Sequence, residues 1–144
     1  MNDDPGNAPP AVPDLTRLIP ASAGTRFDAV IAVSLMIGGG SMTLTELGPQ
    51  RLAIEGSAQV PVMGSMPIAV AFELGDNGDA VGFYDGGRYP GTAAEEAGGL
   101  VIRLGRSLQH RCRVTADGRG GFRIKATLKN RPNVDIRLTP ASAR

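Results

Sequence analysis

The chain has 144 residues, a length that suits one domain with a hydrophobic core of its own. Its 20 glycines and 11 prolines exclude an ordinary helical bundle and favour many strands joined by tight turns. The lack of Trp and an aromatic content of 4% argue against a specific nucleic-acid-binding protein, because few rings are available for bases to stack on.

Residues 1–24 contain five prolines and little hydrophobic periodicity, so they are predicted to form a flexible tail. This segment has neither a basic n-region nor an apolar h-region, and it is not expected to be a signal peptide. The longest apolar run, 29–37, is about half as long as a bilayer-spanning helix. The single Cys cannot form an internal disulfide, which favours a reducing compartment. We therefore expect a cytoplasmic protein without a transmembrane segment.

Alternating apolar and polar residues predict the strands of the first half. A first strand over 26–37 is apolar on both faces for most of its length, so we expect it to be central in the sheet or covered on its second side, and GGG at 38–40 is expected to end it. Three strands follow over 41–47, 51–63 and 66–74, each with one apolar side. The positions predicted to face inward are Met42, Leu44, Leu52, Ile54, Gly56, Ala58, Val60, Val62, Met66, Ile68, Val70, Phe72 and Leu74.

The middle of the chain is ambiguous between helix and strand. A short fifth strand is predicted around Ala80–Asp85. Thr92 followed by Glu95 is a capping-box pattern, which predicts a short helix or a loop over 92–97. Three glycines between 98 and 105 oppose a longer helix, because each costs about 1 kcal/mol relative to Ala. A strand near 100–104 is therefore expected next.

The last third returns to clean alternation over 111–116, 122–128 and 134–138. One side of these strands is apolar, and the other is predicted to form a basic face. Five candidate contacts for phosphate or carboxylate groups make up this basic face: Arg111, Arg113, Arg123, Lys125 and Arg137.

These patterns predict an all-β fold of seven to nine strands, with at most one short helix near 92–97. The expected architecture is a small antiparallel meander β-barrel over residues 25–140, with a two-sheet β-sandwich as the alternative. Residues 1–24 and 141–144 are assigned to terminal tails.

The sequence offers few combinations of side chains that are suited to catalysis. The only His, His110, lies two residues from the only Cys, Cys112, and no third group in the sequence is placed to orient the imidazole. We interpret the pair as a rim histidine beside a buried thiol. Glu95 and Glu96 are interpreted as charges at a helix N-terminus. No catalytic residue, metal site or cofactor is predicted, and an enzymatic role is less favoured than a binding role.

The stretch 43–74, TLTELGPQRLAIEGSAQVPVMGSMPIAVAFEL, resembles the centre of a PilZ domain, a six-stranded barrel of bacterial proteins. That family carries Asp/Asn-x-Ser-x-x-Gly before a strand, and here Glu46, Gly48 and Arg51 occupy its three signature positions. The family's Arg-x-x-x-Arg pair, which grips cyclic di-GMP, is also absent, since Arg17 and Arg26 are nine residues apart. The resemblance implies a degenerate PilZ-like signalling barrel that does not bind the dinucleotide in the family's way.

The charge is divided along the chain. Residues 1–99 carry four basic and twelve acidic residues, whereas 100–144 carry eleven basic and two acidic residues. This division favours a binding or regulatory module that holds an anionic small molecule or an acidic partner protein on the basic face.

Two other functions are carried as alternatives. In the first, small inward residues (Gly56, Ala58, Ala116 and Ala126) leave the barrel lumen unfilled. Such a lumen suits a carrier of lipids or small hydrophobic molecules, or a small cyclase, with Tyr84 or Tyr89 as hydrogen-bond donors. In the second, the acidic and basic halves meet in a structural homo-oligomer.

Overall fold

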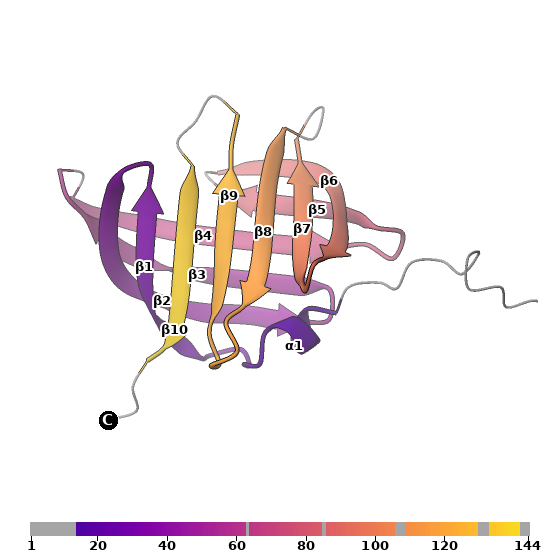
Figure 1. The fold of residues 1–144 in the computed structure, drawn as a ribbon, viewed down its shortest axis with the longest axis horizontal. Helices are drawn as coiled ribbons and strands as arrows, with labels where there is room; N and C mark the ends of the chain where they lie inside the picture. The colour runs from indigo at the N-terminus through magenta and orange to yellow at the C-terminus, as the bar shows by residue number, and fades with distance from the viewer. Residues whose placement is uncertain (1–13, 63, 85, 106–108, 130–132, 142–144) are drawn as a thin grey trace, which may run out of the picture.

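The computed structural model describes residues 14–62, 64–84, 86–105, 109–129 and 133–141. They form ten antiparallel strands closed into a barrel, preceded by one short helix (Figure 1). The elements are α1 (Leu15–Leu18), β1 (Arg26–Val33), β2 (Met36–Gly48), β3 (Arg51–Val60), β4 (Gly64–Leu74), β5 (Asp79–Tyr84), β6 (Gly87–Glu96), β7 (Gly99–Leu104), β8 (His110–Ala116), β9 (Phe122–Thr127) and β10 (Val134–Pro140).

Each strand pairs with its neighbours in the sequence, and β1 pairs with β10 to close the ring. The closing register runs from Phe27 opposite Pro140 to Val33 opposite Val134. In Figure 1, β10, β9, β8 and β7 cross in front of β3, β4 and β5 at a steep angle, so two curved layers enclose one interior. The predicted all-β meander barrel is confirmed, and the barrel form holds over the two-sheet sandwich.

The meander gives the barrel two different ends. We call the end where β1, β3, β5, β7 and β9 finish the open end, and the opposite end the closed end. Helix α1 lies against the closed end, where the Leu15 amide donates to the Pro49 carbonyl at 2.9 Å. Leu15 and Ile19 are buried in the core. The predicted flexible tail over 1–24 is therefore wrong for these residues, because their apolar side chains cover the barrel interior; residues 1–13 lie outside the described residues.

The triple glycine does not end the first strand. The chain turns at Ser34–Leu35, and the glycines lie inside β2, where this strand passes close to β3. A Cβ at Gly38 would lie 2.2 Å from the Gln59 carbonyl oxygen, and one at Gly40 would lie 2.0 Å from that of Ser57. Only glycine permits this approach. The outer side of β1 is not covered, since Val30 is exposed, but the strand is central in the sheet, paired with β10 and β2.

The helix predicted near 92–97 is wrong. Residues 87–96 form β6, in which Thr92 pairs with Asp79 of β5 and with Arg103 of β7. Hydrogen bonds to strands on both sides satisfy the backbone N–H and C=O groups of this segment. The capping pattern, which would satisfy N–H groups at the start of a helix, is therefore not needed here. The strand expected near 100–104 is confirmed as β7.

The interior is packed most completely toward the closed end. Phe27 and Phe122 meet edge to face there, with ring centroids 5.3 Å apart, and both are fully buried. Toward the open end, Val60 and Leu104 are buried, but many inward-facing side chains of the same apolar type are only partly buried. These are Val33, Met36, Met66, Ile68, Val70, Tyr84, Ala126 and Val134. This difference leaves an unfilled space at the open end.

Candidate functional site

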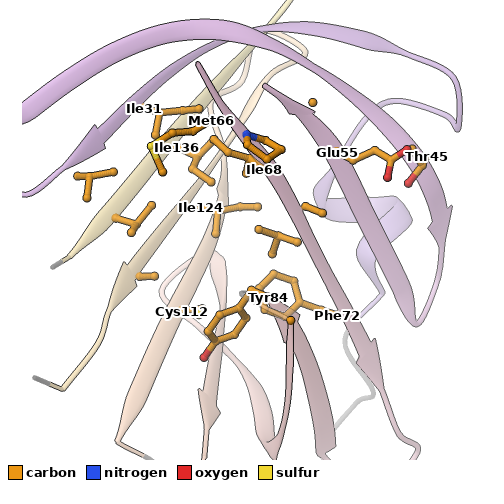
Figure 2. Close-up of a pocket in the computed structure, with 18 of the residues that line it drawn as sticks. Ile31, Thr45, Glu55, Met66, Ile68, Phe72, Tyr84, Cys112, Ile124 and Ile136 are labelled. Atoms are coloured by element: carbon orange, nitrogen blue, oxygen red, sulfur yellow. The ribbon is translucent and has the colours of Figure 1, made fainter. Parts of the chain in front are cut away.

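A hollow of about 920 Å³ opens into the barrel (Figure 2). Its inner wall is built from inward-facing side chains of β1, β4, β8, β9 and β10, and Figure 2 shows several of them converging on one space. The apolar lining residues of this wall are Ile31, Val33, Met66, Ile68, Val70, Phe72, Ile124, Ala126, Leu128, Val134 and Ile136. Because Val33, Met66 and Val134 lie at the open end of their strands and Leu128 directly follows β9, the hollow reaches that end.

Part of this volume lies on the outer surface. Thr43, Thr45, Glu55, Pro67 and Ala69 also line the hollow, yet they occupy outward-facing positions of β2, β3 and β4. They are neighbours in the sheet, with Thr43 opposite Glu55 and Glu55 opposite Ala69. The inner, apolar part is therefore smaller than 920 Å³. The hollow as a whole falls among ligand-sized pockets, which span roughly 300–1,000 Å³.

Both tyrosines and the only histidine gather at the open end of the barrel. Tyr84 comes from the end of β5, Tyr89 from the start of β6 and His110 from the start of β8. The Tyr84 hydroxyl lies 2.7 Å from His110 Nδ1, a hydrogen bond whose direction depends on the imidazole tautomer. The Tyr84 and Tyr89 rings stack with centroids 4.5 Å apart, and the Tyr89 and His110 rings lie 5.2 Å apart. We call these three residues the aromatic cluster.

The aromatic cluster adds a polar group to the apolar hollow. Tyr84 lines the hollow directly, and its hydroxyl orients the His110 ring. The sequence interpretation that nothing orients the imidazole is therefore wrong, because the partner comes from β5, which the curvature of the sheet across β6 and β7 brings near β8. When Tyr84 donates to Nδ1, the imidazole keeps its proton on Nε2 and can donate it to another group.

Cys112 lies one inward position below His110 on β8 and lines the hollow. Burial raises the pKa of its thiol to about 12, so the side chain is a protonated, weakly nucleophilic thiol at neutral pH. The prediction of a buried thiol beside a rim histidine is confirmed.

The five residues of the basic face do share one outer surface. The registers place Arg113 opposite Lys125, Arg123 opposite Arg137, and Lys125 opposite Asp135. Arg111 lies on the same outward-facing side of β8 and is exposed.

Three of these five basic side chains already interact with carboxylate or carbonyl groups of the protein itself. Arg123 forms a two-point ion pair with Asp135, in which Nε lies 2.7 Å from Oδ1 and a terminal nitrogen binds Oδ2. These hydrogen bonds hold the pKa of Asp135 below its usual 3.8. The Arg137 Nε lies 4.0 Å from the same carboxylate. Arg113 donates to the carbonyl oxygens of Glu96 and Ala97 at 3.2 and 3.3 Å.

The two glutamates predicted at a helix N-terminus lie instead at the end of strand β6. Arg103 donates to the Glu96 carboxylate at 3.0 Å, and this hydrogen bond lowers the pKa of Glu96. Glu95 is exposed. They do not form a pair suited to acid–base catalysis.

Of the small residues expected to empty the lumen, Gly56 and Ala126 line the hollow. Ala58 is buried opposite Met66 but does not line the hollow, and Ala116 is exposed at the end of β8.

Within the described ranges, no cluster of three or more His, Cys, Asp or Glu side chains is arranged to hold a metal ion. The described part of the chain also contains no helix of the length and apolar character needed to cross a bilayer. Comparison of the chain with protein-family models, with curated proteins and with solved structures gives no match in any of the three.

Proposed function

We propose that the barrel binds a small hydrophobic molecule in its hollow, with the apolar body inside and a polar group at the aromatic cluster. The observation that carries this proposal is the unfilled apolar space at the open end. Side chains there could have closed the interior, as they do at the closed end, and burying an apolar surface in such a space gains about 25 cal/mol per Å².

The aromatic cluster favours a ligand with one hydrogen-bonding end. Few polar groups reach the inner hollow, so an apolar ligand would be held by shape alone except near Tyr84 and His110. An imidazole N–H and a phenol suit a carbonyl, carboxylate or hydroxyl oxygen. An amphipathic lipid-like molecule, such as a fatty acid or a polyketide-like ring, combines these two features.

The basic face is a weaker candidate for a small-ligand site. Arg123 and Arg137 share Asp135, and Arg113 donates to backbone carbonyls. The charges of Lys125 and Arg111 also act on internal carboxylates, those of Asp135 and Glu96. Binding of an anionic small molecule there, assembly into a homo-oligomer, the PilZ-like resemblance and the cytoplasmic location all stay predictions.

The proposal is tested by filling the hollow. In Ala126→Trp the indole would occupy the inner hollow, whereas Thr127→Trp places the same side chain on the exposed outer side of β9. Binding of the neutral fluorophore N-phenyl-1-naphthylamine is followed by fluorescence, with lauric acid as competitor.

The wild-type protein and Thr127→Trp should bind the fluorophore saturably, and lauric acid should displace it. Ala126→Trp should bind at least about tenfold more weakly, since the ligand loses most of its buried area. Equal binding by the two variants, or no saturable binding to the wild type, would overturn the proposal. Circular dichroism establishes that both variants keep the β-sheet fold.

A further inference from the structure

Two hairpin tips at the open end carry apolar side chains in full contact with water. Leu35, in the turn between β1 and β2, is 98% exposed, and Val62, in the turn after β3, is 102% exposed. Ile37, beside the first tip, is 63% exposed. Because β2 pairs with β3 from Gly39 opposite Gln59 onward, the two tips project from neighbouring strands. Together they form an apolar rim beside the mouth of the hollow.

The local sequence does not explain these side chains. Val62 was expected to face inward, but the chain has already turned, and the residue has a φ of 72°. A β-branched residue is disfavoured in this left-handed region, where turns normally use Gly, Asn or Asp. Exposed apolar side chains at a turn add nothing to the core, and a cluster of them indicates an interaction surface.

Charge is distributed along the barrel axis in a way that identifies the partner. Among the described residues, three exposed basic side chains lie at the open end: Arg88 and Arg111 are the second residues of β6 and β8, and Lys129 follows β9. Asp135, an acidic residue near this end, is held by Arg123. The closed end carries four exposed arginines, Arg17, Arg26, Arg51 and Arg119, but also most of the described acidic side chains, so its balance is acidic. These acidic residues are Asp14, Glu46, Glu73, Asp76, Asp79, Glu95, Glu96 and Asp117.

We propose that the open end docks onto the surface of an anionic lipid membrane. Leu35 and Val62 insert among the lipid headgroups, Arg88, Arg111 and Lys129 contact anionic phosphates, and the acidic closed end points away. The combination of apolar anchors with a basic surround is what interfacial binding requires. The role of this docking depends on the proposed function. With the open end on the membrane, a hydrophobic ligand can pass between bilayer and hollow without crossing water.

A second copy of the chain fits this surface less well than a membrane. Two open ends meeting about a twofold axis would bring basic residues of one copy toward basic residues of the other, which opposes association. Anionic headgroups complement the same residues, and the lipid beneath them accepts the apolar tips.

The test is co-sedimentation with vesicles made of phosphatidylcholine and phosphatidylglycerol in equal parts, compared with vesicles of phosphatidylcholine alone. Wild-type protein should bind the mixed vesicles and bind the neutral ones far more weakly. Leu35→Ser and Val62→Ser should each weaken binding about tenfold, because each removes an apolar side chain that the membrane buries on docking. Arg88→Gln should weaken it about fivefold and lower its sensitivity to salt.

The matched control is Val30→Ser, which removes an exposed valine from the outer side of β1 away from the tips. It should bind vesicles like the wild type. All four variants should keep saturable binding of N-phenyl-1-naphthylamine, so the membrane proposal and the cavity proposal fail separately.

Three results would overturn the membrane proposal. The first is no binding to the mixed vesicles by a wild-type protein that still binds the fluorophore. The second is vesicle binding that the tip variants leave unchanged. The third is a wild-type dimer in sedimentation velocity that Leu35→Ser converts to a monomer, which would make this surface an interface between copies.

Discussion

The two ends of this barrel differ in packing although their inward-facing residues are of the same kinds. At the closed end, helix α1 adds Leu15 and Ile19 to the interior, and residues such as Ile54 are almost completely removed from water. At the open end no comparable element covers the interior within the described residues, and Ile68 remains partly exposed beside the hollow. Whether an apolar side chain contributes to stability or lines a binding site is therefore decided by what covers the end of the barrel.

The largest expected effect concerns Cys112, at the boundary between the two regions. With a pKa of about 12, the native thiol should react with 5,5′-dithiobis(2-nitrobenzoic acid) at pH 8 roughly a thousandfold more slowly than in the urea-unfolded chain. Stopped-flow absorbance measures both rates. Comparable rates would place Cys112 in the accessible part of the hollow and move the boundary toward the closed end.

An isoleucine-to-alanine substitution at each end of the barrel should affect the free energy of unfolding differently. Ile54→Ala should lower the free energy of unfolding by about 2–5 kcal/mol, because it leaves a cavity in a packed core. Ile68→Ala should cost less than about half as much, since the side chain faces space that is already unfilled. Urea unfolding followed by circular dichroism measures both. Equal losses would mean that the open end is packed as tightly as the closed end.

The smallest expected effect lies on the outer surface. Arg123 lowers the pKa of Asp135, so the folded state favours the carboxylate, and this stabilisation is present above the unfolded pKa near 3.8. It is lost as the pH falls through the lower pKa of the folded state. Because the pair is partly exposed, Asp135→Asn should cost about 0.5–1 kcal/mol at pH 7.

Thermal unfolding of wild type and Asp135→Asn between pH 7 and pH 2 tests this prediction. The difference in stability between the two proteins should shrink below pH 4. A difference that stays constant over the whole range would show that the ion pair does not stabilise the fold. The hollow should be unaffected in either case, because the pair lies on the outer face.

Sequence alternation predicted the walls of the barrel well, because a strand sends successive side chains to opposite faces wherever it lies. It placed Leu52, Ile54, Ile124 and Ile136 inside, and all four are buried. It failed over 92–97, where a local capping pattern was outweighed by pairing with β5 and β7.

The candidate site was harder to predict, because it depends on closure and on the ends. The contact between Tyr84 and His110 joins β5 to β8, which are not neighbours in the sheet. A usable signal did exist, since Tyr84, Tyr89 and His110 all occupy inward positions at strand ends that meet at the open end. Recognising it requires knowing that the ring closes and that α1 covers the other end.

The most direct test of the central claim uses the isoleucine methyl groups as reporters. Four isoleucines line the hollow, namely Ile31, Ile68, Ile124 and Ile136, whereas Ile19, Ile54 and Ile102 lie in the core without lining it, and Ile37 is on the outside. In methyl NMR spectra titrated with N-phenyl-1-naphthylamine, the account predicts large shift changes and ligand contacts for the first four residues only. Equal changes at Ile54 and Ile102, or changes confined to Ile37, would contradict it.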